Sequence, residues 1–344
     1  MQTQIVNADS KESIKLAADV IRSGGLVAFP TETVYGLGAD ATNEAAVAKI
    51  FAVKNRPTFD PLIVHVTNIE MPPLVVSTIP ESARLLIDAF WPGPLTIVLR
   101  KTEEIPDIVT AGLHTVAVRM PRNDSALALI NEARVPIAAP SANSFGYPSP
   151  TRVEHVITDL GGKIDLILNG GITQVGVEST VLDLTCAIPC ILRPGGVSWE
   201  SLTRVLGQVS ISSEKEGGVL KSPGQMKQHY APRAKMLLFG GKCREKVIET
   251  MRERIAELKK GSRIGIMVPE EEFAHFTDTD GIVIGLGSFA TMEQVARELF
   301  ATMRALDNRG VNYIFALAPP KEGLGLAVFD RLFKASGSQV IEVD

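Results

Sequence analysis

Short apolar runs that suit buried strands alternate with helical patterns along most of the chain, and this alternation restricts the fold more than any other feature. Val47, Ile50 and Phe51 recur at helical spacing, and the apolar run 62–66 follows them after two prolines. A proline ends a helix because it lacks a backbone N–H and crowds the preceding turn. The pattern predicts an α/β protein in which polar turns follow buried strands.

The same reasoning gives the elements that we expect. Strands are expected at 26–29, 62–66, 95–99, 116–120, 135–139, 166–169, 181–184, 236–239, 264–268, 282–285, 312–317 and 339–343. Helices are expected at 152–160, 198–206, 243–259, 289–306 and 325–335, besides those that end near Gly24, Lys54, Trp91 and Ala133.

The 344 residues, 45% of them hydrophobic and 22% charged, are enough for two folded domains. The polar stretch 210–218 marks a change of composition. We therefore predict a first α/β domain at 1–208, a linker at 209–233, and a smaller Rossmann-like domain with a parallel sheet at 234–344. The second half of the linker, 222–233, carries a histidine, a tyrosine and basic residues, so we expect it to fold over a ligand.

Composition also limits the function. A net charge of −4 argues against a polycationic protein that binds nucleic acid over its whole surface, although it leaves a local basic groove as an alternative. The three cysteines, Cys186, Cys190 and Cys243, make no disulfide framework, and no further Cys or His pair suggests a metal site. The sequence has no signal-peptide pattern and no apolar run long enough to span a membrane, which predicts a cytoplasmic protein without membrane contact.

Polar side chains gather where predicted strands and helices end. Lys54 and Arg56 lie at and just after the predicted end of a helix. The run 30–38 (PTETVYGLG) places hydroxyl side chains and glycines in one turn, and residues 141–143 follow a buried strand. Taken singly, these residues also suit solvated charges and locally capped turns. Arg119 lies within an apolar strand, which favours an arginine held for an anion.

A glycine pattern in the second half deserves comparison with a dinucleotide site. Residues 285–290 match G-x-G-x-x-A after a strand. However, the match is not in the first βα unit of its domain, and no acidic residue ends a following strand at the expected distance. The pattern therefore favours a structural helix entry.

The N-terminal segments together resemble the YrdC-like family, and the layout of two domains resembles the long form of the threonylcarbamoyl-AMP synthases. The matching motifs are, in chain order, 30–38 (PTETVYGLG), 54–66 (KNRPTFDPLIVHV), 91–95 (WPGPL), 118–121 (VRMP), 139–143 (APSAN), 179–181 (STV) and 223–232, which ends in HYAP.

The resemblance implies a YrdC-like twisted-sheet domain and an activity. That activity is the condensation of L-threonine, bicarbonate and ATP into L-threonylcarbamoyl-adenylate, with release of pyrophosphate. The product feeds a threonylcarbamoyl-transferring machinery that modifies adenosine 37, next to the anticodon, in tRNA. Magnesium is expected to come with ATP and not to have a dedicated protein site.

The resemblance also implies site residues. Catalytic roles fall on the K-x-R and S-x-N pairs, which are Lys54, Arg56, Ser141 and Asn143. ATP-binding positions are the same four together with Asp60, Thr115, Ser149, Arg193, Tyr230 and Arg233. Threonine-binding positions are Thr33, His65, Arg119, Ala139 and Ser179.

The chemistry of these side chains agrees with nucleotidyl transfer. Lys54 and Arg56 can neutralise phosphates, and the Arg119 fork can grip a carboxylate. Tyr230 and Arg233 could close over a labile adenylate and exclude water. Asp60 stands where the family usually has Asn; a carboxylate repels phosphates, so we expect Asp60 to face magnesium or to contribute less than its counterpart.

Two alternatives remain. An RNA-binding module of the same fold would use Lys54, Arg56, Arg119, Arg193 and the segment 227–233 on phosphates, which the net charge disfavours. The carbamoyl-adenylate module of hydrogenase maturation proteins shares the fold, but those proteins carry zinc-finger and acylphosphatase segments that this sequence lacks.

Overall fold

The structure is a computed structural model that describes residues 2–71, 74–212, 220–224, 226, 229–258 and 261–344. It divides into two compact units. The first comprises residues 1–145 and 149–225, and the second comprises residues 146–148 and 226–344. The boundaries predicted at 208 and 234 lie on either side of this division, and most of the polar stretch at 210–218 lies outside the described residues.

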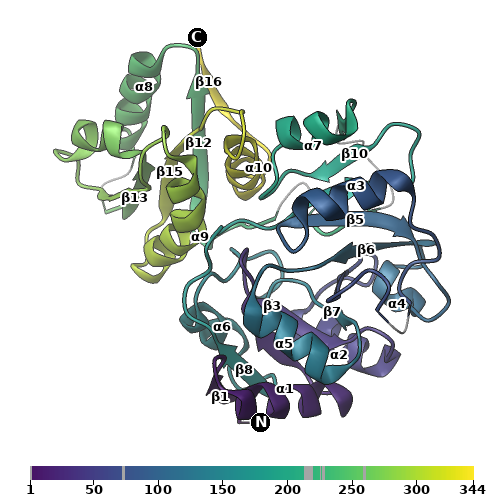
Figure 1. The fold of residues 1–344 in the computed structure, drawn as a ribbon. Helices are drawn as coiled ribbons and strands as arrows, with labels where there is room; N and C mark the ends of the chain where they lie inside the picture. The colour runs from purple at the N-terminus through teal and green to yellow at the C-terminus, as the bar shows by residue number, and fades with distance from the viewer. Residues whose placement is uncertain (1, 72–73, 213–219, 225, 227–228, 259–260) are drawn as a thin grey trace. The chain divides into compact units, whose positions relative to one another are not determined.

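The first unit contains one mixed sheet with the strand order β1-β8-β2-β3-β7-β4-β6-β5-β9-β10-β11 (Figure 1). The strands are β1 (Gln4–Asn7), β2 (Val27–Phe29), β3 (Gly36–Asp40), β4 (Ile63–His65), β5 (Leu95–Arg100), β6 (Thr115–Arg119), β7 (Ile137–Ala138), β8 (Leu166–Asn169), β9 (Thr180–Asp183), β10 (Cys190–Arg193) and β11 (Ser210–Ile211). The helices are α1 (Lys11–Arg22), α2 (Glu44–Lys54), α3 (Glu81–Phe90), α4 (Asp107–Thr110), α5 (Asp124–Ala133), α6 (Val153–Leu160) and α7 (Trp199–Leu206).

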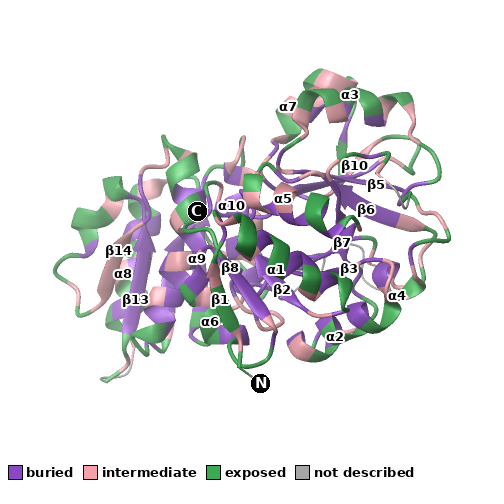
Figure 2. Ribbon diagram, turned by 60° about the horizontal axis from the view of Figure 1, so that its bottom comes forward, coloured by how far each residue is buried: buried purple, intermediate pink, exposed green. Residues whose placement is uncertain are grey.

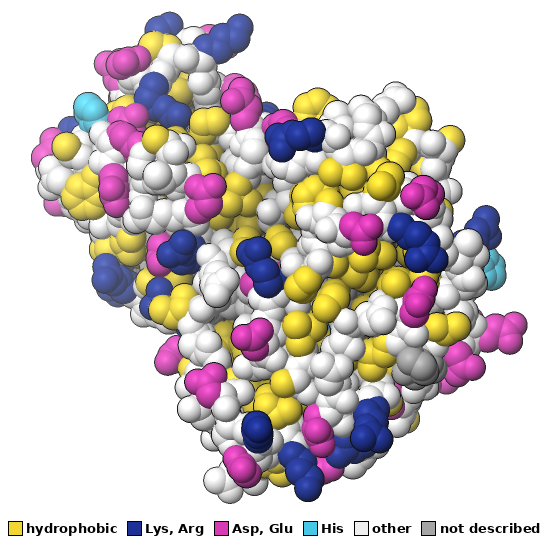
Figure 3. Space-filling model, viewed as in Figure 1, with side chains coloured by type: hydrophobic (Ala, Val, Ile, Leu, Met, Phe, Trp, Pro, Cys, Tyr) yellow, Lys and Arg dark blue, Asp and Glu magenta, His cyan; other side chains and the backbone are white. Residues whose placement is uncertain are grey.

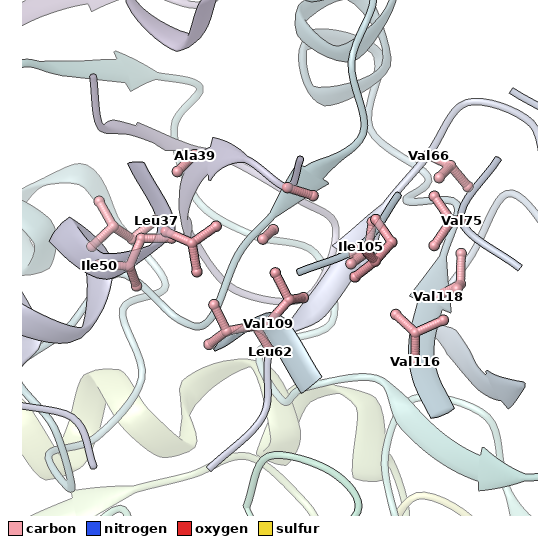
Figure 4. Close-up of a cluster of buried hydrophobic side chains, with 14 of the residues drawn as sticks. Leu37, Ala39, Ile50, Leu62, Val66, Val75, Ile105, Val109, Val116 and Val118 are labelled. Carbon is pink, nitrogen blue, oxygen red and sulfur yellow. The ribbon is translucent and has the colours of Figure 1, made fainter. Parts of the chain in front are cut away.

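Helices pack in pairs on this sheet, α1 beside α5 and α3 beside α7 (Figure 1). Beneath α2, aliphatic side chains from the helix, the strands and the loops between them form a core cluster, in which Ile50, Leu62, Val109 and Val118 are fully or almost fully buried (Figure 4). Burial of such side chains is the main favourable term in folding. The cluster therefore fixes the end of α2 and the starts of β4 and β6, where candidate residues lie.

The helix that leads to Lys54 forms as predicted. The Asn43 side chain caps it by accepting a hydrogen bond from the backbone N–H of Ala46. The helix ends at Lys54, and Asn55 takes a left-handed conformation with φ 52° at its C-terminal cap. This ending turns the chain so that Arg56 donates its backbone N–H to the carbonyl of Phe51.

The prediction that 30–38 forms one turn is wrong for its second half. Residues from Gly36 onward form β3, which pairs antiparallel with β2. A Cβ atom at Gly38 would lie 2.7 Å from Ile137 and 2.8 Å from Phe29, so the glycine permits close packing inside the sheet. Further elements that were not expected from the sequence are β1, α4, β10, β11 and η1 (Glu270–Phe276), and β11 lies in the predicted linker.

The second unit has an open five-stranded sheet, all of it parallel, with the order β14-β13-β15-β12-β16. Its elements are β12 (Lys235–Gly241), α8 (Arg244–Ala256), β13 (Ile264–Val268), the 3-10 helix η1 (Glu270–Phe276), β14 (Ile282–Gly285), α9 (Met292–Asn308), β15 (Tyr313–Leu317), α10 (Gly325–Ala335) and β16 (Ile341–Val343). The predicted parallel α/β architecture is confirmed, and its order places β15 between β12 and β13. In Figure 2, β13 is coloured as buried, whereas α8 carries exposed residues.

The glycine pattern at 285–290 lies at an edge of this second sheet, after β14. The following helix, α9, begins only at Met292, and its Thr291 cap makes no side-chain hydrogen bond to the helix. Among the described residues, no helix is long and apolar enough to cross a membrane.

Candidate functional site

Lys54 joins two of the sequence motifs. Its side chain, at the last turn of α2, is 2% exposed. The Nζ donates a hydrogen bond to the backbone carbonyl of Ser141 at 2.6 Å and another to that of Asn143. Lys54 of the K-x-R pair and the S-x-N segment, far apart in sequence, therefore meet in one place.

Arg56 is paired inside the protein. Its Nη2 lies 2.9 Å from the carboxylate of Asp60, and the guanidinium also donates to the carbonyls of Asp60 and Pro61. Both side chains are buried, and the guanidinium lies over the ring of Phe145 at 5.9 Å. The sequence analysis expected Asp60 to face magnesium or to contribute less than an asparagine, whereas the structure gives its carboxylate a protein cation.

Three cations act on the Asp60 carboxylate. Burial raises the pKa of Asp60, and Arg56, Arg193 and Lys54 each oppose that rise through their positive charge. Lys54 is the last residue of α2, Arg56 follows two residues later, and Arg193 is the last residue of β10. The first unit therefore gathers positive charge from distant segments around one buried carboxylate.

Arg193 extends the arrangement to the STV motif. Its Nε and Nη2 both donate to the backbone carbonyl of Ser179, at 3.2 and 3.0 Å, and Nη2 lies 3.3 Å from the Ser179 hydroxyl. That hydroxyl also makes a 2.7 Å hydrogen bond with the hydroxyl of Thr96. The Arg193 Nη1 donates to the carbonyl of Pro223 at 3.3 Å. The fork thus ties β10, the STV motif and the start of the HYAP-containing segment together.

Ser149 has an acidic partner that the sequence analysis missed. Its hydroxyl donates to the carboxylate of Glu178, and both side chains are buried. Glu178 directly precedes Ser179 in the stretch Val177–Thr180. Its place directly before the STV motif was the signal available in the sequence.

Arg119, at the end of β6, is 3% exposed, and its Nη2 lies 2.6 Å from a carboxylate oxygen of Glu32. Its Nε donates to the carbonyl of Gly93 at 3.2 Å. The expectation that a buried arginine here is held for an anion agrees with this pair, but Glu32 was not among the candidate residues. The signal was available, since Glu32 lies inside the PTETVYGLG motif.

The remaining candidates for threonine binding lie on neighbouring strands and loops. His65 ends β4, opposite Arg119 of β6 in the parallel register. Burial, aided by the charge of Arg119, lowers the pKa of His65 to about 3, so the imidazole is neutral at physiological pH. The Ala139 N–H donates to the carbonyl of Ile63, and the Thr33 hydroxyl lies 2.8 Å from that of Thr31.

Thr115 lies at the opposite end of β6 from Arg119. Four residue-to-residue steps along the strand separate them by about 13 Å. Because β4 runs parallel to β6, Thr115 lies toward the end where the chain enters β4 from Asp60. Arg119 lies at the other end of the strand, opposite His65.

Tyr230 and Arg233 belong to the second unit. The Tyr230 ring is buried, 5.4 Å from the ring of Phe300 and 5.0 Å from the guanidinium of Arg331. The backbone N–H of Arg233 donates to Asp307 at 2.8 Å. Their predicted closure over a nucleotide stays a prediction.

No group of three or more His, Cys, Asp or Glu side chains that could hold a metal ion occurs among the described residues. The free cysteines Cys186 and Cys190 lie near Asp183 and Lys221 instead, where Cys186 donates to the Asp183 carboxylate at 3.2 Å.

Fold and site together define a two-domain α/β protein whose first domain gathers arginine, lysine and small hydroxyl side chains from strand ends, a class suited to nucleotides and other anions. Comparison with known proteins narrows this class. A family model described as "Telomere recombination" matches residues 19–195, and a model described as "Threonylcarbamoyl-AMP synthase, C-terminal domain" matches residues 197–337. The chain belongs to the threonylcarbamoyl-AMP synthase family, in its two-domain form.

Curated relatives match along the full length. A threonylcarbamoyl-AMP synthase of Pyrococcus abyssi is 47% identical over 96% of both chains, and that of Bacillus subtilis is 43% identical over 95% of this chain and 94% of its own. The crystal structure of P. abyssi Sua5 complexed with L-threonine has a TM-score of 0.92 at 45% identity, and the match covers 100% of this chain and 99% of the other.

Proposed function

We propose that the protein is an L-threonylcarbamoyladenylate synthase, a nucleotidyltransferase. It condenses L-threonine, bicarbonate and ATP into threonylcarbamoyl-AMP and releases pyrophosphate. The family membership and the relatives bearing this name support the assignment. The observation that carries it in the structure is the ion pair of Arg56 with the buried Asp60 carboxylate, whose pKa the charges of Lys54 and Arg193 also lower, because a triphosphate needs such a concentration of positive charge.

ATP is assigned to the cationic side of the site. The Lys54 ammonium and the Arg56 and Arg193 guanidinium groups would neutralise phosphate oxygens, and Ser141 and Asn143 would add directional hydrogen bonds. Nucleotidyl transfer asks little covalent help from a protein, since positioning and charge neutralisation lower the barrier. Asp60, Thr115 and Ser149 complete this set within the first unit, and Tyr230 and Arg233 would close over the nucleotide.

L-Threonine is assigned to the side of the site formed by Arg119 and its neighbours. The planar Arg119 fork suits a carboxylate, and the hydroxyls of Thr33 and Ser179 suit a small polar amino acid. The neutral ring of His65 and the backbone at Ala139 would orient the substrate. L-Threonine is also the compound named in the complex of the P. abyssi protein.

Magnesium fits this scheme as a companion of ATP. The carboxylates at the site support magnesium bound through ATP and not through the protein. The buried acidic groups described there each contact an internal arginine or serine partner, and they are Glu32, Asp60 and Glu178. Magnesium would reduce the negative charge on the phosphates. The cytoplasm, where ATP and bicarbonate are available and tRNA is modified, is the proposed location, with a threonylcarbamoyl-transferring machinery as the downstream partner.

Product formation tests the function directly. The protein is incubated with ATP, Mg²⁺, bicarbonate and one amino acid at a time, and pyrophosphate and the adenylate are measured, the latter by mass spectrometry. We expect threonine-dependent release of pyrophosphate and a threonylcarbamoyl-AMP mass. Absence of that mass with all three substrates present would refute the assignment.

The RNA-binding alternative makes a different prediction. It requires salt-sensitive RNA binding without pyrophosphate release. On the face shown in Figure 3, lysine and arginine side chains are interspersed with aspartate and glutamate side chains over the described residues. In the part of the chain that the structure describes, this face therefore lacks the continuous run of positive charge on which nonspecific RNA binding relies.

A further inference from the structure

Glu32 is a buried acidic group to which the proposed function assigns no role. Its side chain is 1% exposed, and it lies in the loop between β2 and β3, next to Thr33. Its Oε2 is 2.6 Å from Nη2 of Arg119. Within the described part of the chain, however, neither oxygen of Glu32 accepts a hydrogen bond, and the Arg119 Nη2 donates none.

The two groups therefore attract one another by charge, while among the described residues the Glu32 oxygens and the Arg119 Nη2 make no hydrogen bond. Burying a carboxylate without hydrogen bonds is unfavourable by several kcal/mol, so such groups are rare unless a ligand completes them. The arrangement offers an acceptor for an N–H donor and, beside it, a donor for an oxygen anion. An α-amino acid carries both complements on neighbouring atoms, since its ammonium donates and its carboxylate accepts.

We infer that Glu32 binds the α-ammonium group of the amino acid substrate and accepts its proton, while Arg119 binds the carboxylate. The inference rests on the proposed function and adds a catalytic residue to it. Thr33 lies next to Glu32 in the chain, so the same loop presents a hydroxyl to the substrate and a carboxylate to its amine.

The proton transfer to Glu32 makes the threonine amine nucleophilic for the first step, its attack on bicarbonate. At neutral pH the amine of threonine is protonated and has no free electron pair. Transfer of one proton to Glu32 gives a neutral amine and a carboxylic acid. The amine then attacks the bicarbonate carbon, the C–N bond forms and a C–O bond breaks, and the departing hydroxide takes a second proton from nitrogen to leave as water. The products are the carbamate, water and protonated Glu32, which returns its proton to solvent.

The charged and titratable groups around Glu32 are compatible with this role. Arg119 of β6 is the cation that faces it. His65 of β4, which pairs with Arg119 in the parallel register, is neutral because burial lowers its pKa to about 3. The imidazole is therefore too weak a base to take the proton. Glu32 is the group beside Arg119 that can.

The test is Glu32→Gln, which keeps the size and one hydrogen-bond acceptor but cannot take a proton. Near neutral pH we expect kcat for threonylcarbamoyl-AMP formation to fall by at least about 10²-fold, the usual size of a general-base effect. As pH rises toward about 9.5, free threonine supplies its own neutral amine, so the deficit should shrink to about fivefold or less. A purely structural role would leave the deficit equal at every pH.

Binding gives a second readout that needs no turnover. By titration calorimetry, the wild type should prefer L-threonine over its deaminated analogue 3-hydroxybutanoate by about 10²-fold, and Glu32→Gln should reduce that preference by about tenfold. Glu104→Gln, an exposed residue, is the matched control and should behave like the wild type. A thermal melt checks that each variant is folded.

The outcomes separate this inference from the proposed function. If the wild type makes no threonylcarbamoyl-AMP, the function is wrong. If the wild type makes it and Glu32→Gln is as active near neutral pH, or loses the same factor across the pH range with an unchanged preference for threonine, the inference about Glu32 is overturned while the function stands.

Discussion

Replacement of Lys54 by Met tests whether this side chain both stabilises the S-x-N segment and binds the nucleotide. The methionine keeps the apolar stem of a residue that is 2% exposed, and it removes the ammonium that donates to the carbonyls of Ser141 and Asn143. Each hydrogen bond to a charged group is worth about 1.5–3 kcal/mol. Relief of the ammonium's desolvation offsets part of the loss, so we expect the unit to lose about 3 kcal/mol of stability.

That loss should lower the unfolding temperature by about 6–12 °C, since 1 kcal/mol corresponds to about 2–4 °C in a unit of this size. The effect on catalysis should be larger than folding explains. Well below the melting temperature, kcat/KM for ATP in the pyrophosphate assay should fall by at least about 10²-fold, the usual result of removing one donor to developing charge.

Lys49→Met is the matched control, because Lys49 lies on the same helix and also donates to a backbone carbonyl, that of Gly24. It should cost less stability, since its side chain is exposed, and leave kcat/KM unchanged. If Lys54→Met melts early but keeps kcat/KM within about threefold of the wild type, Lys54 is only a brace, and the assignment of the triphosphate to this place is wrong.

Three further predictions concern other parts of the chain. Arg193→Lys keeps the charge but loses the fork that donates twice to one carbonyl, so kcat/KM for ATP should fall by about tenfold in the pyrophosphate assay. Because the pKa of His65 is about 3 in the folded protein against 6.5 as the ordinary value, the unfolded chain binds more protons below pH 6.5, and stability falls as pH decreases. Urea unfolding of His65→Gln should therefore lose about 2.7 kcal/mol less than the wild type between neutral pH and about pH 4.5. Asp307→Ala removes the acceptor of Tyr147 and of two backbone N–H groups, so urea unfolding should show a loss of about 3 kcal/mol, with the exposed Asp280→Ala as control.

The fold was predictable where local patterns and packing agree. The helix that begins after Asn43 and ends at Lys54 has a capping residue, an apolar stripe and proline stops in its sequence. The parallel sheet of the second unit also follows from alternation of strands and helices. β3 was missed because its glycines are typical of turns, while in the structure they admit the rings and aliphatic chains of neighbouring strands.

The short edge strands were missed for a different reason. β1 has a mostly exposed four-residue pattern, and β11 has two exposed residues inside a polar stretch, so neither shows a periodic apolar face. Both are strands because β8 and β10 offer parallel partners. Such pairing depends on tertiary structure, and no window of local sequence contains it.

The site was predictable as a set of positions and not as a set of pairs. Motif matching named Arg56, Arg119 and Arg193. The sequence alone indicates that each is a cation able to bind an anion, but not which group it contacts. The structure shows each in contact with an internal partner, which is Asp60, Glu32 or the carbonyl of Ser179. These partners are set by strand register and by loops that approach from distant parts of the chain, which spacing alone does not reveal.

Internal pairing changes how substrate binding must work. A phosphate or carboxylate that reaches Arg56 or Arg119 joins an existing ion pair, so its gain in free energy is the difference between two partners and not the full attraction of an unpaired charge. The buried pairs in turn hold the guanidinium groups in fixed positions, which lowers the entropic penalty of binding. Such an arrangement lowers the affinity for each substrate but fixes the positions of the groups that bind it. A reaction between three substrates depends above all on this orientation.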